Sequence, residues 1–369
     1  MNVILRWVAD LLQRLLRNLD LPLLAALLAL MGVGLAVLYS AGNASRQLVA
    51  TQGAYFGIGL VALWLASRMP PHLLKQATPP VYALSLVPMV LVLFIGSGKY
   101  GNHWINLGVF NFQPSELAKL TLPMMMAWHL DRRPLPPGLR SVGVAFLILA
   151  LPVGLILLQR DLGTAMLVLA SGVFVLFLAG LSWWWFIGAA TATIPAALAA
   201  WFWLLRPYQK DRILIFRNPE TDPMGAGWNI MQSKIAIGAG GLTGKGWGEG
   251  TQSHLDYLPE HTTDFVFSVF SEEYGWVGVV FVLALYLLVI GRCLWIAADS
   301  RDSYSRLLAG ALGLAMFWYV LVHGGMISGL LPVVGVPMPL LSRGGTSSIA
   351  LLAGFGVVMA LRAQRSRNR

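Results

Sequence analysis

Four clusters of polar residues lie beside long apolar runs of the chain, and their side chains could transfer protons or bind an anion. Carboxylates, a lysine and two arginines occur in them, together with Gly and Pro. Ionisable side chains at membrane depth are costly to desolvate, so they are candidates for a functional site by default. The clusters span residues 111–119, 159–164, 258–264 and 333–348.

The first two clusters each have a functional and a structural interpretation. Glu116 and Lys119 are three positions apart on a predicted helix, so they share a face and can pair. Such a pair could serve the chemistry, or it could only stabilise the start of the helix. Asp161 precedes another predicted helix, where it could hold a cation or a substrate group, or simply cap the helix.

Asp264, in the third cluster, has the sequence context of a catalytic acid or base. A helix that begins near Asp264 would carry Ser268, Ser271 and Glu272 on the same face. A carboxylate at the head of a polar stripe, near the water boundary, suits a general base that must reach a substrate proton. The alternative is an acid that only stabilises the start of the helix, because the helix dipole favours a negative charge there.

The fourth cluster and a long polar loop supply irregular backbone and cations. Pro337, Pro339 and the Gly344–Gly345 pair predict a broken helix, which is tolerated at membrane depth where it lines a cavity. Exposed amides beside Arg343 could bind a phosphate, or the segment could be an ordinary loop before the last apolar run. Further cations that could approach a phosphate lie in the loop 206–263, and they are Lys210, Arg212, Arg217, Lys234 and Lys245.

Composition indicates which elements must position these residues. Hydrophobic residues make up 57% of the 369 residues, charged residues only 11%, and the mean hydropathy is +0.69. Soluble proteins have about 25% charged residues. We therefore expect an all-α, polytopic membrane protein with about ten spans of about 20 residues each. The predicted spans are 21–41, 48–67, 80–97, 114–130, 142–158, 163–181, 184–205, 274–297, 307–330 and 346–362.

The segments outside these spans complete the predicted organisation. Residues 1–20 are predicted to form an amphipathic helix in the membrane interface, because their Leu, Ile and Val side chains form one stripe. Residues 21–363 are predicted to form a single transmembrane domain, with an ordered loop at 206–263 between the seventh and eighth spans. Residues 364–369 are predicted to form a basic tail in the cytoplasm.

The distribution of Lys and Arg orients the predicted spans. Fifteen of these residues lie in the termini and one set of alternate short loops, against four in the opposite short loops. The positive-inside rule therefore predicts both termini in the cytoplasm, and the long loop and all four polar clusters outside. The net charge of +10 follows from this topology, and nucleic-acid binding is not supported. The six scattered His and the single cysteine, Cys293, argue against a transition-metal site and an intramolecular disulfide.

At its polar motifs the chain resembles the SEDS family (shape, elongation, division and sporulation), and within it the rod-shape, RodA branch. The resemblance covers nearly the whole chain, and LPVVGVPMP is closer to the rod-shape branch than to the division-type relatives. Two positions depart from the family. Many relatives have His two residues before the Asp that corresponds to Asp264, whereas here His261 lies three residues before it. Arg343 stands where relatives commonly have Tyr. The matching motifs are FNFQPSELAK at 110–119, RDLGTA at 160–165, NPETDPMGAGWNIMQSKIAIGAGGLTGKG at 218–246, PEHTTDFVFSVFSEEYG at 259–275 and LPVVGVPMPLLSRGGTSS at 331–348.

The resemblance implies a ten-span peptidoglycan glycosyltransferase that polymerises lipid II on the outer face of the bacterial cytoplasmic membrane during cell elongation. It implies a class B penicillin-binding protein, a transpeptidase of the elongation complex, as partner. It also implies that Asp264 is the catalytic carboxylate, and that Glu116, Lys119, Asp161 and Ser342 belong to the substrate cavity.

The expected mechanism needs a base and cations. Asp264 would remove a proton from a sugar 4-hydroxyl, and the sugar oxygen would displace undecaprenyl pyrophosphate. Cations must stabilise that leaving group, and we expect Mg²⁺ or Mn²⁺ among them and no organic cofactor. The candidate side chains are Arg212, Lys234, Lys245 and Arg343.

Two rival functions stay open at this point. One is a lipid II flippase or other transporter, which would need polar groups at the midplane, commonly in repeat-related broken helices. The acids instead cluster at the outer ends of the predicted spans, and no internal repeat is obvious. The other rival is a non-catalytic scaffold for the penicillin-binding protein.

Overall fold

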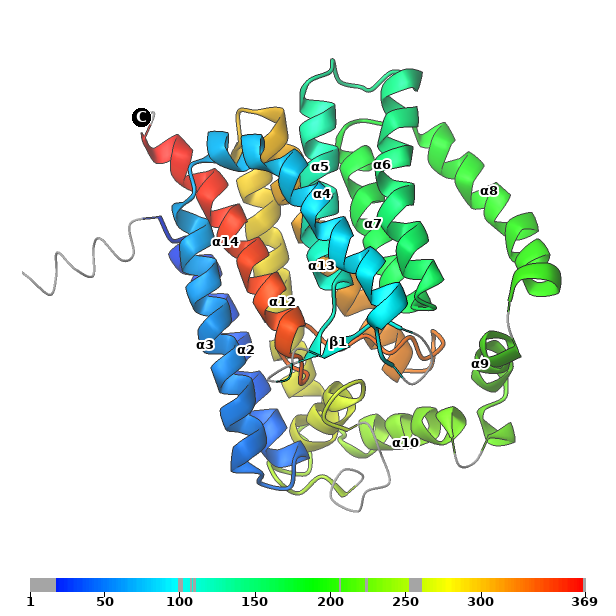
Figure 1. The fold of residues 1–369 in the computed structure, drawn as a ribbon. Coiled ribbons are helices and arrows are strands. Elements are labelled where there is room, and N and C mark those ends of the chain that lie inside the picture. Colours follow the sequence, from blue (N-terminus) through cyan, green and yellow to red (C-terminus); the bar gives the residue numbers. More distant parts are fainter. Residues whose placement is uncertain are drawn as a thin grey trace, which may run out of the picture.

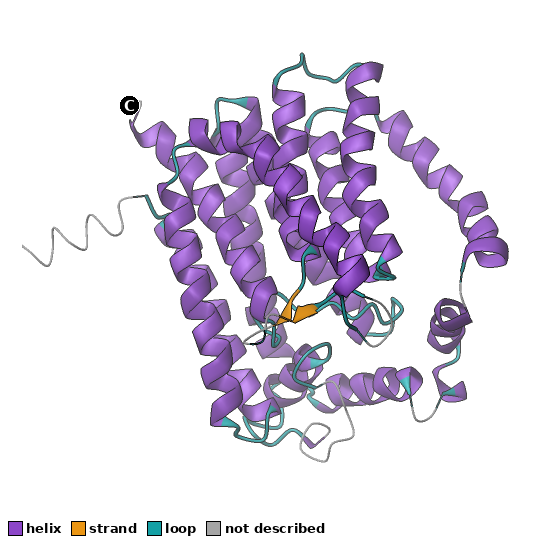
Figure 2. Cartoon of the chain, in the orientation of Figure 1, coloured by secondary structure: helices purple, strands orange, loops and turns teal. Residues whose placement is uncertain are grey.

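The computed structural model describes residues 18–98, 102–106, 108, 111–205, 207–222, 225–251 and 261–367. Within these ranges the chain forms a bundle of ten long helices, with shorter helices and one hairpin at one end of it (Figure 1 and Figure 2). The long helices are α2 (Leu21–Ala41), α3 (Arg46–Arg68), α4 (Pro71–Ile95), α5 (Ser115–Asp131), α6 (Leu139–Leu158), α7 (Leu162–Leu178), α8 (Trp183–Ala199), α12 (Val266–Asp299), α13 (Ser303–Ile327) and α14 (Gly345–Arg367).

Each predicted span corresponds to one of these helices. Eight helices, with α8 counted through Trp203, are long and apolar enough to cross a membrane by length and composition, while α5 and α7 have 17 residues each. The prediction of a mostly helical, multi-pass membrane protein is therefore confirmed. The predicted interfacial helix lies mostly outside the described residues, as does the end of the tail, and the domain boundaries stay predictions.

Two helices begin before the apolar spans predicted for them. The helix α4 begins at Pro71 instead of residue 80 and continues through Pro79 and Pro80, because an apolar helix in a bundle tolerates interior prolines. The helix α12 begins at Val266, close to the start near Asp264 that the polar stripe predicts and before the apolar span predicted from residue 274, since its first two turns are buried in the core. A kink at Gly275, where φ is 61°, separates those turns from the rest of the helix.

Close backbone packing holds the bundle together. The helix α14 packs along α3, and α12 packs between α2 and α13. A Cβ atom at Gly34 would collide with the backbone of Leu340, and one at Gly356 with the backbone of Leu63. Only glycine permits these approaches, which bring α2 against the segment before α14 and bring α14 against α3.

The helix α8 lies apart from the other long helices. It leans away from the bundle in Figure 1, and none of its residues is buried. Its apolar side chains are exposed on all sides, which suits a helix surrounded by lipid. A π-helical turn, η1 (Ala200–Leu204), continues α8 toward the long loop.

The long loop is ordered over much of its length, as the sequence predicts. It contains α9 (Pro207–Arg217), a short 3-10 helix η2 (Pro219–Thr221) and α10 (Ala226–Ala239). A small departure from an all-α fold lies between α4 and α5. There, β1 (Ile105–Asn106) and β2 (Asn111–Phe112) form an antiparallel hairpin in which Ile105 faces Phe112.

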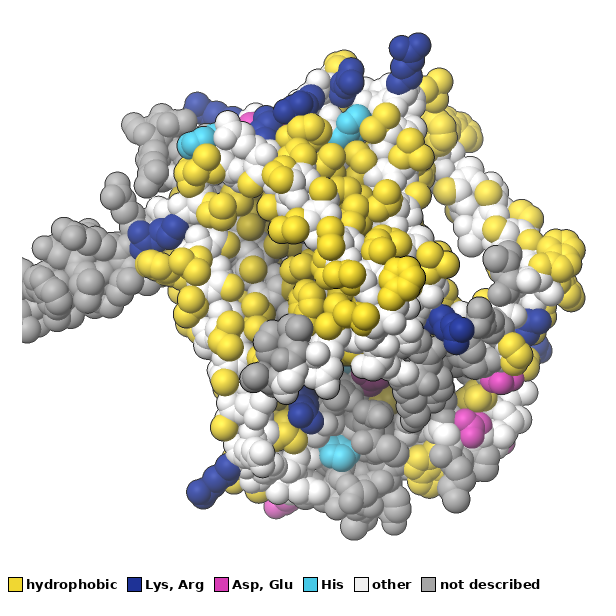
Figure 3. Space-filling model, in the orientation of Figure 1, with side chains coloured by type: hydrophobic (Ala, Val, Ile, Leu, Met, Phe, Trp, Pro, Cys, Tyr) yellow, Lys and Arg dark blue, Asp and Glu magenta, His cyan; other side chains and the backbone are white. Residues whose placement is uncertain are grey.

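The two ends of the bundle differ in charge. Successive helices run in opposite directions, so α3, α5, α12 and α14 all end at the same end of the bundle. Figure 3 shows Lys and Arg side chains along this edge, above a band of hydrophobic side chains. We call it the basic end, and its described cations include Arg68, Lys75, Arg132, Arg133, Arg140, Arg301 and Arg306.

A buried carboxylate joins three helices at the basic end. Asp20, only 1% exposed, accepts a hydrogen bond of 3.0 Å from the Leu23 amide and so caps α2. The same carboxylate accepts hydrogen bonds from Arg292 of α12, at 3.0 and 3.1 Å, and pairs with Arg362 of α14. Three helices that are distant in sequence thus converge on one charge.

Candidate active site

A cavity of about 760 Å³ opens at the opposite end of the bundle, where α5 and α14 begin and α6 and α13 end. We call this end the cavity end. All four polar clusters contribute side chains to the lining. The lining includes Gln113, Glu116, Lys119, Arg160, Asp161, Thr263, Asp264, Arg343 and residues 332–337.

Asp161 performs two tasks at the start of α7. Its Oδ1 atom accepts a hydrogen bond of 3.0 Å from the Thr164 amide, so Asp161 does cap the helix. Its Oδ2 atom accepts a hydrogen bond of 3.0 Å from the Gln113 side chain, which comes just before α5. The Gln113 carbonyl in turn accepts from the Glu116 amide at 3.1 Å. Asp161 therefore links the start of α7 to the start of α5.

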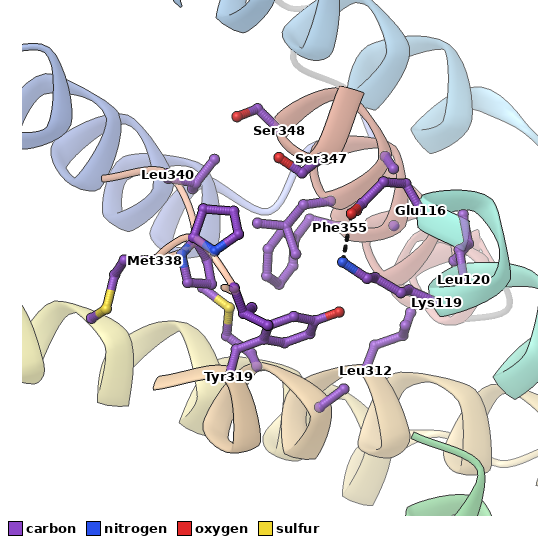
Figure 4. Close-up of a pocket in the computed structure, with 18 of the residues that line it drawn as sticks. Glu116, Lys119, Leu120, Leu312, Tyr319, Met338, Leu340, Ser347, Ser348 and Phe355 are labelled. Carbon is purple, nitrogen blue, oxygen red and sulfur yellow. Dashed lines mark hydrogen bonds and ion pairs between the residues drawn. The ribbon is translucent and has the colours of Figure 1, made fainter. Parts of the chain in front are cut away.

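Glu116 and Lys119 form the ion pair that their spacing predicts. Lys119 Nζ lies 2.7 Å from Glu116 Oε1 and 5.2 Å from the centre of the Tyr319 ring, which comes from α13. Figure 4 shows this pair at the edge of a second, smaller pocket of about 70 Å³. The pair lines both spaces, so it stands between the large cavity and a pocket that is mainly apolar.

Asp264 lies at the cavity wall, two residues before α12 begins at Val266. A Cβ atom at Gly335 would be 3.6 Å from Asp264 Oδ2, so the carboxylate lies against the backbone of the irregular segment 332–342. The Arg343 amide donates a hydrogen bond of 3.0 Å to the Thr262 carbonyl. The turn that carries Asp264 is thus attached to the start of α14.

The polar stripe that follows Asp264 faces away from the cavity. Ser268 Oγ lies 2.7 Å from Ser233 Oγ of α10, and Glu272 pairs with Lys245 at 2.6 Å. The face of α12 below Asp264 is therefore covered by α10 and by residues 240–251. The stripe holds the long loop in place, and only its first residue reaches the cavity.

The irregular segment 332–342 is held by side chains from three directions. His323 Nδ1 lies 3.0 Å from the Val336 carbonyl, and the Tyr286 hydroxyl donates to the Pro339 carbonyl at 2.6 Å. Ser342 Oγ accepts a hydrogen bond of 2.8 Å from the Met338 amide. Ser342 is 2% exposed and lines the smaller pocket, so its clearest contact is with the backbone of this segment.

The sequence of the chain is similar to that of known proteins over nearly its whole length. Residues 16–367 match the family of FtsW, RodA and SpoVE, described as cell cycle proteins. The chain belongs to this family. It is 45% identical over 350 residues to the peptidoglycan glycosyltransferase MrdB of Escherichia coli (strain K12), and the match covers 94% of each chain.

Solved structures of the FtsW/RodA/SpoVE family have the same fold. One comes from work on the structural coordination of polymerization and crosslinking by a peptidoglycan synthase complex. It has a TM-score of 0.83 and 34% identity, and the match covers 94% of this chain and 98% of that one. The rod shape determining protein RodA of Thermus thermophilus has a TM-score of 0.72 and 31% identity, over 95% and 98% of the two chains. This family member is accordingly a multi-pass bacterial membrane protein.

The predicted phosphate-binding cations fall into different places. Arg343 lines the large cavity. Lys245 pairs with Glu272, and the Lys234 side chain lies against Gly329 at the end of α13, so the cavity lining does not include either lysine. The side chain of Arg212 lies outside the described part of the chain. Both lysines precede α12 in sequence, but the fold places them behind the cavity wall.

Several residues of the cavity and of the elements beside it were not singled out from the sequence. Arg160 and Gln113 line the cavity and lie next to residues that were singled out, so their position in the motifs was an available signal. Tyr319 and His323 lie inside an apolar run, and their contacts reach the irregular segment or α5. No local pattern marks them.

The described residues do not form a protein-held metal site. Within the described ranges, no group of three or more His, Cys, Asp or Glu side chains is close enough together to hold a metal ion. The cavity carboxylates Glu116, Asp161 and Asp264 come from three separate elements, and Glu116 and Asp161 already have partners in Lys119 and Gln113. The donor set does not fit a resident divalent cation.

Proposed function

We propose that this chain is a peptidoglycan glycosyltransferase that polymerises lipid II into glycan strands. The observation that carries the proposal is the cavity that brings Asp264 together with Arg343 and the Glu116–Lys119 pair. A base and a cation in one cavity are what the transfer of a sugar from a diphosphate requires. The glycosyltransferase relative supports the same reaction class.

The proposed reaction forms one bond and breaks one. Asp264 accepts the proton of the 4-hydroxyl of the acceptor sugar as that oxygen attacks the anomeric carbon of the donor glycan. A glycosidic C–O bond forms, and the bond between the anomeric carbon and the diphosphate oxygen breaks. The leaving group, undecaprenyl diphosphate, takes the electron pair of the broken bond. Its new charge lies beside Arg343, which stabilises it electrostatically.

A divalent cation enters the proposal only as a companion of the substrate. Mg²⁺ keeps few protein ligands and commonly binds substrate phosphates. We expect EDTA to lower glycan synthesis and excess Mg²⁺ or Mn²⁺ to restore it. The thermal midpoint of the substrate-free protein should not respond to either ion, because the described residues form no three-ligand cluster.

The proposed orientation places the cavity outside the cytoplasmic membrane and both termini in the cytoplasm. The basic end supports it, because short cytoplasmic loops carry an excess of Lys and Arg. The proposed partner is a class B penicillin-binding protein of the elongation complex. The similarity to a chain of a peptidoglycan synthase complex supports that partnership.

Labelled lipid II tests the proposal. We expect purified protein, with the class B partner, to produce a ladder of glycan strands on a gel. Asp264→Asn should abolish the ladder because it keeps the size of the side chain and removes the base. Asp299→Asn, at the other end of the same helix, is the matched control and should leave the ladder intact.

Other outcomes point to the rival functions. A ladder from Asp264→Asn would refute the assignment of the base. An absent ladder under every partner and metal condition would favour a flippase or a scaffold. Movement of lipid II across sealed vesicles would then identify the flippase.

A further inference from the structure

Arg160 has a backbone conformation that arginine rarely adopts. It follows the end of α6, and its φ is 64°. Helices often end on a residue of this left-handed conformation, but glycine usually occupies the position because a side chain makes it unfavourable. An arginine here therefore costs folding free energy that glycine would not.

The surrounding structure fixes Arg160 in this conformation. Its amide donates to the Leu157 carbonyl at 3.0 Å, and the next amide, of Asp161, donates to the Ile156 carbonyl at 3.3 Å. Gln159, 1% exposed, donates from its side chain to the Met89 carbonyl of α4 at 3.0 Å. The chain on both sides of Arg160 is anchored, so its exposed side chain belongs to a rigid turn at the cavity.

Arg343 approaches the same cavity from a separate element. Its backbone is attached to the turn of Asp264 through the Thr262 carbonyl, and its side chain is exposed. Among the described residues, neither Arg343 nor Arg160 forms an ion pair. Two guanidinium groups thus line one cavity without a carboxylate bound to either.

Other side chains and the start of a helix already compensate most of the remaining charges of the cavity. Glu116 and Lys119 neutralise each other, and Asp161 is engaged by Gln113 and by the start of α7. Asp264 is the remaining described carboxylate of the lining. Guanidinium groups bind phosphoryl oxygens in a bidentate manner, and two of them match the two phosphoryl groups of a diphosphate.

We propose that Arg160 and Arg343 together bind the diphosphate of the lipid-linked substrate. The unfavourable left-handed backbone conformation of Arg160 holds its guanidinium group at the cavity. The identity of the lipid rests on the proposed glycosyltransferase function, whereas the pairing of the two arginines rests on the cavity itself.

Direct binding tests this pairing without catalysis. The probes are undecaprenyl diphosphate and the uncharged undecaprenol, titrated into the purified full-length protein. We expect Arg160→Gly and Arg343→Gln each to weaken diphosphate binding by about tenfold or more and to leave undecaprenol binding unchanged. Diphosphate affinity should also depend less on salt in both variants. Arg46→Gln, an exposed arginine at the cavity end that does not line the cavity, is the matched control.

Arg160→Gly also separates binding from misfolding. Glycine relieves the left-handed strain, so the variant should keep or raise the thermal midpoint while it loses diphosphate affinity. Wild-type diphosphate affinity in either variant would overturn the proposal. An equal loss of diphosphate and undecaprenol binding would overturn it too, because the arginines would then only shape the cavity.

The two proposals can fail separately. If both arginine variants lose diphosphate binding but the wild-type protein makes no glycan with its partner, the diphosphate site is supported and the glycosyltransferase function is refuted. A chain that makes glycan through Asp264 while both arginine variants bind diphosphate normally refutes the site alone.

Discussion

The contact between residues 240–251 and α12 makes a measurable prediction about Lys245. The Lys245 amide donates to the Glu272 carbonyl at 3.0 Å, and the Gly246 amide donates to the Glu273 carbonyl at the same distance. Lys245 Nζ lies 2.6 Å from Glu272 Oε1, and the Glu272 side chain is fully buried. The lysine is therefore expected to hold this part of the loop on the helix that Asp264 precedes.

Lys245→Met keeps most of the side-chain length and removes the charge. The Glu272 carboxylate would then be buried without its cation, which typically costs about 3–5 kcal/mol. Two features reduce the cost: Lys245 is 31% exposed, and Thr251 still donates two hydrogen bonds to Glu272, at 2.9 and 3.0 Å. We expect a loss of about 2–3 kcal/mol in the local stability of the segment.

Hydrogen exchange measures this loss. A change of about 2–3 kcal/mol corresponds to about a 30- to 160-fold increase in local opening. Amides of residues 240–251 should exchange faster by that factor in Lys245→Met, while those of α13 should not change. Lys210→Met, which removes a loop cation from α9, is the control, and Lys245→Arg should recover part of the protection.

One result would refute this reasoning. If exchange in residues 240–251 is unchanged by Lys245→Met but affinity for undecaprenyl diphosphate falls, Lys245 binds the substrate as the sequence alone predicts. The ion pair with Glu272 would then contribute nothing measurable to the position of the loop.

Two further predictions concern carboxylates that organise the bundle. Asp161→Ala removes a helix cap worth about 1 kcal/mol and the contact with Gln113, so we expect glycan synthesis to fall at least about tenfold. Asp161→Asn keeps the helix cap through its amide oxygen, and its amide nitrogen can meet Gln113 only if the Gln113 amide turns over to accept, so it should retain more activity than Asp161→Ala; an equal loss in both variants would contradict a positioning role. Asp20→Asn leaves Arg292 and Arg362 without their shared carboxylate, which should cost about 2–3 kcal/mol and lower the thermal midpoint. An unchanged midpoint in detergent would argue against that cluster as a stabilising link.

Much of the fold could be predicted from local patterns. A span needs about 20 apolar residues whatever its neighbours are, so all ten long helices were predicted. The start of α4 was missed, and α12 begins before its predicted apolar span, because both of these starts depend on context. Interior prolines are tolerated only when the rest of the bundle supports the helix, and the buried first turns of α12 depend on α10 and the loop segment that cover them.

The shared location of the candidate site residues could be predicted from the membrane topology. Helices that alternate in direction return every second loop to the same end of the bundle. Glu116, Asp161, Asp264 and Arg343 begin or precede helices that run the same way, so their shared position follows from counting spans. Their roles in catalysis stay predictions.

Sequence alone determined the class of the protein, the number of its long helices, the end of the bundle that carries its polar clusters, and its family. These features depend on hydrophobic length, on charge and on contiguous motifs, all of which are local. Only the tertiary structure decided that Lys245 meets Glu272, that Arg160 reaches the cavity, and that His323 supports Val336. A charged or polar side chain takes the partner that packing brings to it, and that partner often lies on a helix far away in the chain.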